Sequence, residues 1–155
     1  MGAIDYPILK SEKNRTLKKI VEQSEREWLI FLAKFLHLKK IENIIILELN
    51  KENYVVDYFI IGTVKMPEHS FAVVNELKRI SKQLNSKIPS VEGLNESGWT
   101  IVKWDFCALH LFTENIRNYY NIEELWVDAK RIYWRNARLT TLPHPKKLLS
   151  TTQQE

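Results

Sequence analysis

Cys107 and His110 are the two side chains of this sequence best suited to covalent chemistry, because a thiol and an imidazole can serve as nucleophile and general base. They are three residues apart in a short apolar segment that we expect to form a strand. Residues three apart on a strand face opposite sides of the sheet, so the thiol cannot pass its proton to this imidazole. The pair therefore does not predict a nucleophilic site.

Metal-ligating residues are also poorly arranged for a site. A structural zinc ion needs Cys and His pairs at close spacing. The cysteine and histidines that the sequence offers are His37, His69, Cys107, His110 and His144. No close-spaced set can be made from them, so we predict no metal site.

Phosphate-binding loops need clustered glycines, so that backbone amides can approach the anion. The four glycines are scattered at Gly2, Gly62, Gly93 and Gly98. Among the carboxylates, Asp57 stands alone at a strand, and the neighbouring Glu123 and Glu124 diverge on a predicted helix. Metal-assisted phosphoryl transfer would need two carboxylates close together. We therefore predict no catalytic residue and no cofactor.

The segment from Val91 to Ala129 combines carboxylates with aromatic residues of the kind that interfaces favour. This mixture is typical of a docking surface and not of an active site. The candidate partner-binding residues are Glu92, Gly98, Trp99, His110, Arg117 and Tyr120.

Five of these six candidates have a structural alternative. Trp99 can be half-buried under the loop at 91–93, and His110 can be a hydrogen-bonded histidine inside its apolar strand. Arg117 and Tyr120 can clamp the C-terminal helices to the sheet instead of contacting a partner. An ordinary solvated acidic face equally explains Glu92. Leu125 and Trp126 are expected in the core.

The apolar patterns predict the elements that must position these residues. Pro67 suits the first turn of its helix. The expected helices are 17–38, 67–84 and 115–138, the last of which a break near Asn121 could divide, and the expected strands are 44–49, 54–61, 87–91, 99–103 and 107–112.

This order of elements predicts an α/β fold, with one domain and a small mixed sheet flanked by helices. The domain spans residues 15–138 and includes an extra N-terminal helix. Polar composition predicts a flexible N-terminus at 1–14 and a disordered basic tail at 139–155.

Charge is distributed unevenly along the chain. Residues 1–40 contain nine Lys/Arg and five Asp/Glu, residues 41–128 contain eight and thirteen, and residues 129–155 contain six and one, so the net charges are +4, −5 and +5. An acidic middle favours basic partners, and basic ends can contact a phosphate backbone such as ribosomal RNA. The alternative is that the ends only improve solubility.

The expected compartment is the cytoplasm. The longest apolar runs are far shorter than the roughly 18–20 residues of a membrane span. We also find no secretory signal, and the lone Cys107 cannot form an internal disulfide.

A series of short motifs between Asn43 and Ala129 resembles the ribosomal silencing factor family, also called RsfS or Iojap. The matching residues are Asp57-Tyr58-Phe59-Ile60-Ile61, His69, Val91-Glu92-Gly93, Trp99, His110, Arg117, Tyr119, Tyr120, Glu123, Leu125, Trp126, Asp128 and Ala129. Two segments depart from the family pattern: Val64 to Pro67 replaces a glycine and small polar residues, and Asp105 replaces a hairpin glycine.

The resemblance implies a ribosome-binding factor that is not an enzyme. It implies docking on ribosomal protein fourteen of the large ribosomal subunit, which blocks joining of the small subunit and represses translation. The family topology is similar to that of nucleotidyltransferases, whose catalytic carboxylate pair is missing here. A nucleotidyltransferase-like enzyme and a general RNA-binding module remain the alternatives, and a homodimer is compatible with the sequence.

Overall fold

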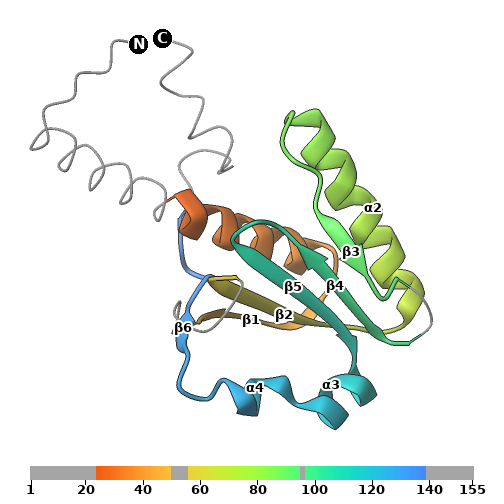
Figure 1. The fold of residues 1–155 in the computed structure, drawn as a ribbon, viewed down its shortest axis with the longest axis vertical. Helices are drawn as coiled ribbons and strands as arrows, with labels where there is room; N and C mark the ends of the chain where they lie inside the picture. The colour runs from red at the N-terminus through yellow and green to blue at the C-terminus, as the bar shows by residue number, and fades with distance from the viewer. Residues whose placement is uncertain (1–23, 50–55, 95–96, 139–155) are drawn as a thin grey trace, which may run out of the picture.

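The computed structural model describes residues 24–49, 56–94 and 97–138 (Figure 1). The predicted flexible N-terminus at 1–14, the start of the predicted helix at 17–38 and the predicted tail at 139–155 lie outside these residues.

A mixed sheet forms the centre of the fold, in the order β3-β4-β5-β2-β1-β6. β2 and β5 are parallel neighbours, and the other adjacent strands are antiparallel. This arrangement confirms the predicted α/β class. The strands are β1 (Glu42–Glu48), β2 (Tyr58–Val64), β3 (Ser90–Glu92), β4 (Trp99–Lys103), β5 (Cys107–Thr113) and β6 (Lys130–Ile132).

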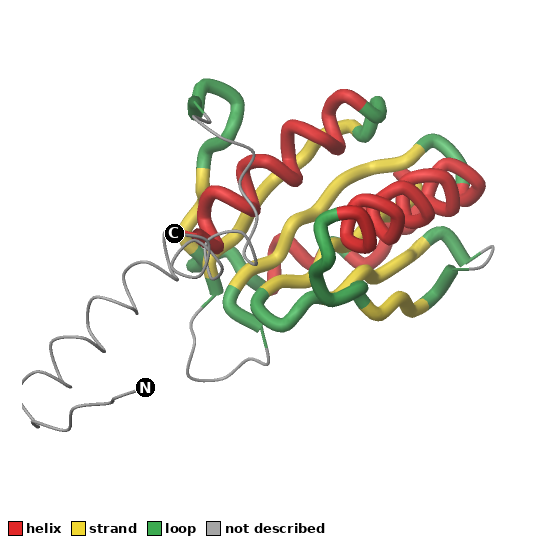
Figure 2. Tube along the Cα trace, turned by 90° about the horizontal axis from the view of Figure 1, so that it is seen from above, coloured by secondary structure: helices red, strands yellow, loops and turns green. Residues whose placement is uncertain are grey.

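Two long helices cover one face of the sheet, as Figures 1 and 2 show. The first occupies residues 24–38 of the described chain, and the second is α2 (Pro67–Gln83), with Pro67 in its first turn as predicted. They bury an apolar core whose largest fully buried side chains include Trp28, Leu29, Leu32, Leu36, Ile46, Ile60, Leu77, Leu109 and Leu111.

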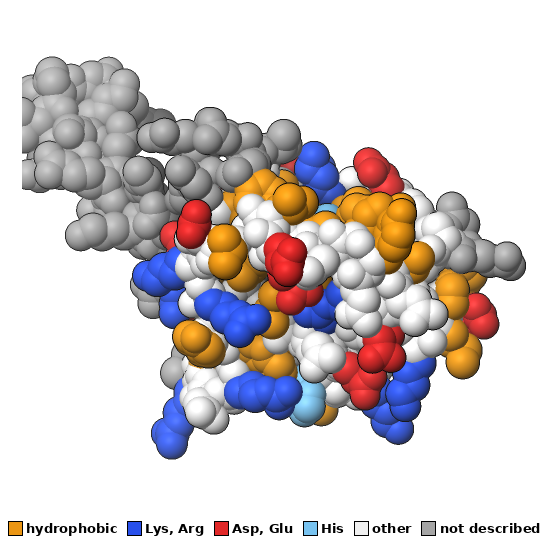
Figure 3. Space-filling model, turned by 90° about the horizontal axis from the view of Figure 1, so that it is seen from below, with side chains coloured by type: hydrophobic (Ala, Val, Ile, Leu, Met, Phe, Trp, Pro, Cys, Tyr) orange, Lys and Arg blue, Asp and Glu red, His pale blue; other side chains and the backbone are white. Residues whose placement is uncertain are grey.

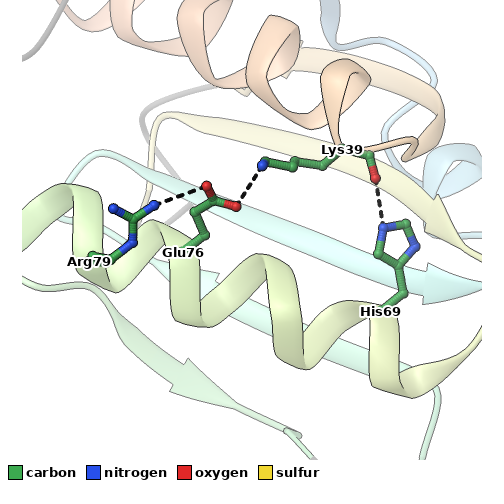
Figure 4. Close-up of polar contacts among 4 residues, drawn as sticks. All are labelled: Lys39, His69, Glu76 and Arg79. Carbon is green, nitrogen blue, oxygen red and sulfur yellow. Dashed lines mark hydrogen bonds and ion pairs between the residues drawn. The ribbon is translucent and has the colours of Figure 1, made fainter.

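A set of polar contacts joins these two helices (Figure 4). His69 bonds through Nε2 to the Lys39 carbonyl at 2.7 Å, and Lys39 Nζ lies 2.8 Å from Glu76 Oε2. Arg79 Nη2 lies 3.1 Å from the other oxygen of Glu76. The hydrogen bond from Lys39 lowers the pKa of Glu76, and these contacts fix the end of the first helix against α2.

The opposite face has a thinner cover, made by α3 (Glu114–Tyr120), α4 (Ile122–Leu125) and the chain that follows. Its buried residues are Leu47, Leu49, Val56, Ile61, Ala108, Phe112 and Ile122. Several neighbours, among them Ile45, Phe59, Trp99 and Ile101, stay partly exposed. This face therefore leaves apolar surface accessible to a partner.

The predicted helix at 115–138 was wrong beyond Leu125. The break near Asn121 is confirmed, since Asn121 adopts a left-handed conformation with φ 44° and ends α3. The later residues instead form β6 beside β1, and Trp134 donates its indole N–H to the Ile44 carbonyl at 3.1 Å. Pairing with a free sheet edge outweighed the helical pattern.

Two strand predictions were displaced. Residues 54–55 of the strand expected at 54–61 lie outside the described residues, and β2 runs from Tyr58 to Val64. The strand expected at 87–91 occupies Ser90–Glu92. The first is set by its parallel pairing with β5, in which Tyr58 lies opposite Cys107. A single-sequence pattern contains no information on such a distant partner.

Cys107 and His110 face opposite sides of the sheet, as predicted. Cys107 belongs to the core beneath the two long helices, whereas His110 contacts Phe59 on the other face. Burial raises the pKa of the Cys107 thiol well above its ordinary value. Its thiolate is therefore not accessible at neutral pH.

Candidate docking surface

Trp99 lies at the centre of a group of aromatic rings on the thinly covered face. As the first residue of β4, it packs its ring against Phe112 and Tyr120, each with a centroid distance of 4.9 Å. Its indole N–H donates to His110 Nδ1 at 3.1 Å. We call Phe59, Trp99, His110, Phe112 and Tyr120 the aromatic cluster.

His110 forms the floor of this cluster. It is 6% exposed, lies edge-on to Phe59 at 4.5 Å and stacks parallel to Phe112. Burial lowers the pKa of His110 to about 4, so the ring is neutral at pH 7. Because Nδ1 accepts the bond from Trp99, the ring proton is assigned to Nε2. His110 thus has the structural role that the sequence left open, holding Trp99 from below.

Two glycines shape the loops around Trp99. Gly98 has φ +83° and Gly93 has φ +71°, and a β-carbon added at Gly93 would clash with the Trp99 carbonyl oxygen. Both conformations disfavour a side chain. Glu92, one residue before Gly93, is exposed on β3 opposite Ile101. A carboxylate therefore borders the aromatic cluster.

Replacing Gly98 by alanine should lower the free energy of unfolding by about 1–2 kcal/mol, because alanine pays a steric cost at positive φ. The new methyl group would also lie 2.7 Å from Thr113 Oγ1 and 2.9 Å from Ile116 Cγ1. Urea unfolding followed by tryptophan fluorescence measures the change. A midpoint equal to that of the wild type would contradict the strain assigned to this turn.

Arg117 is the clamp between α3 and the sheet. Its Nε donates to Glu123 Oε1 at 2.7 Å, and its Nη1 donates to the Asn43 carbonyl at 2.7 Å and to Thr63 Oγ1 at 2.8 Å. The side chain is only 10% exposed. Tyr120, in contrast, is 49% exposed beside Trp99. Of the two residues that the sequence grouped together, only Tyr120 offers substantial surface to a partner.

Arg117→Lys should lower the free energy of unfolding by about 1–2 kcal/mol. A lysine ammonium keeps the charge but cannot reach three separated acceptors in the planar geometry of a guanidinium. Thermal unfolding by circular dichroism gives the change, and Arg79→Lys, which alters an exposed arginine of α2, is the matched control. Equal melting temperatures for the two variants would contradict the clamp.

Apolar side chains continue past the cluster along α3 and α4 and just beyond them. Tyr119, Leu125 and Val127 are 73–79% exposed. The prediction that Leu125 lies in the core was wrong, because α4 is a single short turn whose buried residue is Ile122. Trp126 does pack inward, edge-on to Phe59 at 5.6 Å. Figure 3 views this side of the molecule and shows apolar groups interspersed with charged side chains.

The sequence identified Trp99 and Tyr120 but missed Phe59 and Phe112 as members of the same cluster. Side chains two residues apart on a strand share a face, so the spacing of His110 and Phe112 was a usable signal. The two rings belong to one cluster because the β2–β5 pairing joins residues 49 positions apart in the chain. Phe59 thereby contacts His110 across the strands, and Phe112 stacks on the same histidine.

Neither a metal site nor a membrane helix emerges from the described part of the chain. Within residues 24–49, 56–94 and 97–138, His, Cys, Asp and Glu form no group of three that could hold a metal ion. No helix in these ranges is long and apolar enough to cross a membrane.

The family model described as "Ribosomal silencing factor during starvation" matches residues 22–155. The chain is 31% identical to the ribosomal silencing factor RsfS of Bacillus subtilis over 91 residues, which cover 59% of this chain and 77% of the relative. It is 28% identical to RsfS of Halalkalibacterium halodurans over 94 residues, covering 61% and 80%.

The fold is similar to that of a crystal structure of a protein from Chromobacterium violaceum. The TM-score is 0.54 at 20% sequence identity, and the match covers 81% of this chain and 95% of the other. This similarity supports the single-domain α/β architecture.

Proposed function

Because this chain belongs to the ribosomal silencing factor family, we propose that it docks on ribosomal protein fourteen of the large ribosomal subunit and keeps the small subunit from joining. The chain is a ribosomal silencing factor, a ribosome-binding protein of a family that is not enzymatic.

The aromatic cluster is the observation that carries this proposal. Trp99 and Tyr120 pack against one another, with their rings tilted by 48°, on a sheet face that no long helix covers in the described part of the chain. Tryptophan, tyrosine and arginine dominate the binding energy of protein interfaces. The surrounding surface has exposed carboxylates at Glu92 and Asp128, which suit a partner with positive charge.

Each of the six predicted site residues has a place in the proposed surface. Trp99, Tyr120 and Glu92 contact the partner directly. The other three support these side chains without touching the partner. Gly98 sets the turn before Trp99, His110 accepts the indole hydrogen bond, and Arg117 fixes α3. Rigid support of this kind lowers the entropic cost of binding.

Silencing then follows from steric exclusion. A specific interface needs about 1,200–2,000 Å² of buried surface in total, which a domain of this size can supply. The bound protein occupies volume that the small subunit needs, so inhibition depends on occupancy and consumes no nucleotide. Action on ribosomes fits the expected cytoplasmic location, as does the unpaired Cys107.

Sedimentation of purified ribosomal subunits tests the proposal. Large and small subunits are mixed with and without the full chain and separated on a sucrose gradient. We expect the protein to comigrate with the large subunit and the fraction of joined ribosomes to fall as its concentration rises. Free migration of the protein, or an unchanged fraction of joined ribosomes, would contradict the proposal. Crosslinking from position 99 identifies the ribosomal protein that is contacted.

A further inference from the structure

The outer edge of the sheet, at β6, carries a concentration of positive charge that the docking surface does not use. Residues 129–138 contain four basic residues and no Asp or Glu, whereas residues 41–128 have a net charge of −5. The four are Lys130, Arg131, Arg135 and Arg138, all exposed. None of them forms an ion pair with another described residue, although Glu48 lies opposite Lys130 in the strand register.

The fold also exposes an aromatic ring at this edge. Exposed and buried residues alternate here: Ile132 and Trp134 enter the core, and Arg131 and Tyr133 point the other way. Tyr133 is 78% exposed. Trp134 fixes this alternation, since its indole N–H is bonded to the Ile44 carbonyl. The tyrosine ring is thus held outward beside an arginine.

Arg135 is held in place at the end of the same edge. Its guanidinium carbon lies 4.8 Å from the centre of the Trp134 ring, and Lys34 Nζ donates to its carbonyl at 3.3 Å. A guanidinium that stacks on an aromatic ring keeps its N–H groups free for phosphate oxygens. Lys34 adds another positive charge from the first helix.

We propose that this basic edge, formed by Lys34, Lys130, Arg131, Tyr133 and Arg135, binds an unpaired segment of RNA. The arginines contact phosphates, and one base stacks on Tyr133. An exposed aromatic ring among basic side chains suits single-stranded RNA, whose bases are free to stack, better than a duplex. Lysine at a sheet edge can also serve to prevent edge-to-edge aggregation, but that role needs neither the exposed ring nor the stacked arginine.

The basic edge is separate from the aromatic cluster. Four strand spacings separate β4 from β6, a distance of about 19 Å across the sheet. Trp99 and the basic edge are therefore separate points of contact on the sheet. This inference rests on the proposed function in one respect: the RNA is taken to be ribosomal RNA near the docking site.

Binding of the full chain to a short fluorescein-labelled single-stranded RNA, followed by fluorescence anisotropy across a salt series, tests the inference. Arg131→Gln/Arg135→Gln should weaken binding and reduce the slope of log Kd against log salt by about 1.4, because each phosphate that is no longer neutralised lowers the slope by about 0.7. Tyr133→Ala should weaken binding about tenfold without changing this slope.

Lys65→Gln/Lys82→Gln is the matched control, because it removes the same charge from exposed positions outside the basic edge. The inference is overturned if this control loses as much affinity as the edge variant, or if Tyr133→Ala binds RNA normally. Equally tight binding to phosphatidylglycerol vesicles, sensitive to the arginines and not to Tyr133, would assign the edge to anionic lipid and overturn it too.

Failure of RNA binding at the basic edge can be distinguished from failure of binding to the large subunit. The anisotropy experiment uses naked RNA, so it can succeed when large-subunit binding fails. Conversely, Trp99→Ala should retain its affinity for this RNA while losing comigration with the large subunit. A loss of RNA binding in Trp99→Ala would show that the two surfaces are not separate and would contradict the assignment to the basic edge.

Discussion

Trp99→Ala should weaken binding to the large ribosomal subunit by about 2 kcal/mol or more, which is about a thirtyfold increase in Kd. The substitution removes the ring that connects Phe112, Tyr120 and His110. It thus removes the proposed anchor and also one of the rings that pack against Tyr120. Titration of labelled protein with purified large subunits gives the affinity, and the joined-ribosome fraction should recover in parallel.

Trp104→Ala is the control for removal of a large aromatic ring. Trp104 packs against Trp28 beneath the two long helices, on the other face of the sheet. Trp99→Phe tests the hydrogen bond to His110, because it keeps an aromatic ring without the indole donor. Wild-type affinity in Trp99→Ala would make Trp99 a packing residue only. Equal losses of affinity in Trp99→Ala and Trp104→Ala would point to general destabilisation.

Features of the fold that depend only on the residues of one short segment could be predicted from the sequence. Pro67 marks the start of α2, and Asn121 marks the break after α3, because both residues have distinctive backbone preferences. The side chains of β5 alternate between the two faces of the sheet, as those of any strand do. This alternation alone correctly placed Cys107 and His110 on opposite faces.

Features that depend on distant partners could not be predicted. Residues 130–132 form a strand only because β1 offers a free edge, and the alternation of side chains continues to Trp134 because the Ile44 carbonyl accepts its indole N–H. Similarly, the sequence left open whether Arg117 contacts a partner or clamps α3 to the sheet. Its hydrogen bonds to Asn43 and Thr63, which lie far away in the sequence, show that it is a clamp. The docking surface is therefore a property of the sheet order more than of any single motif.

Acidification should destabilise this protein through His110. Its pKa is about 4 in the folded chain and about 6.5 in an unfolded one. Between these values the unfolded chain binds a proton that the folded chain does not, so the free energy of unfolding falls as pH decreases from about 6.5 to about 4. The expected decrease is about 3 kcal/mol, complete below about pH 4 and absent above about pH 6.5.

Urea unfolding of the wild type and His110→Gln at several pH values measures this contribution. A glutamine cannot titrate and still offers an acceptor to the Trp99 indole, so the stability difference between the two proteins should change by about 3 kcal/mol across this range. His37→Gln, at an exposed histidine, is the control and should follow the wild type. Parallel curves for wild type and His110→Gln would contradict the buried neutral ring.

Protonation of His110 in the folded chain, which begins only near pH 4, would also affect docking. An imidazolium has N–H donors at both nitrogens, so protonated His110 can no longer accept the hydrogen bond from Trp99. The indole would lose its fixed orientation in the aromatic cluster while the rest of the sheet remains paired. Affinity for the large subunit should therefore fall as the pH approaches about 4 in the wild type, and less steeply in His110→Gln, whose side-chain oxygen accepts the bond at every pH.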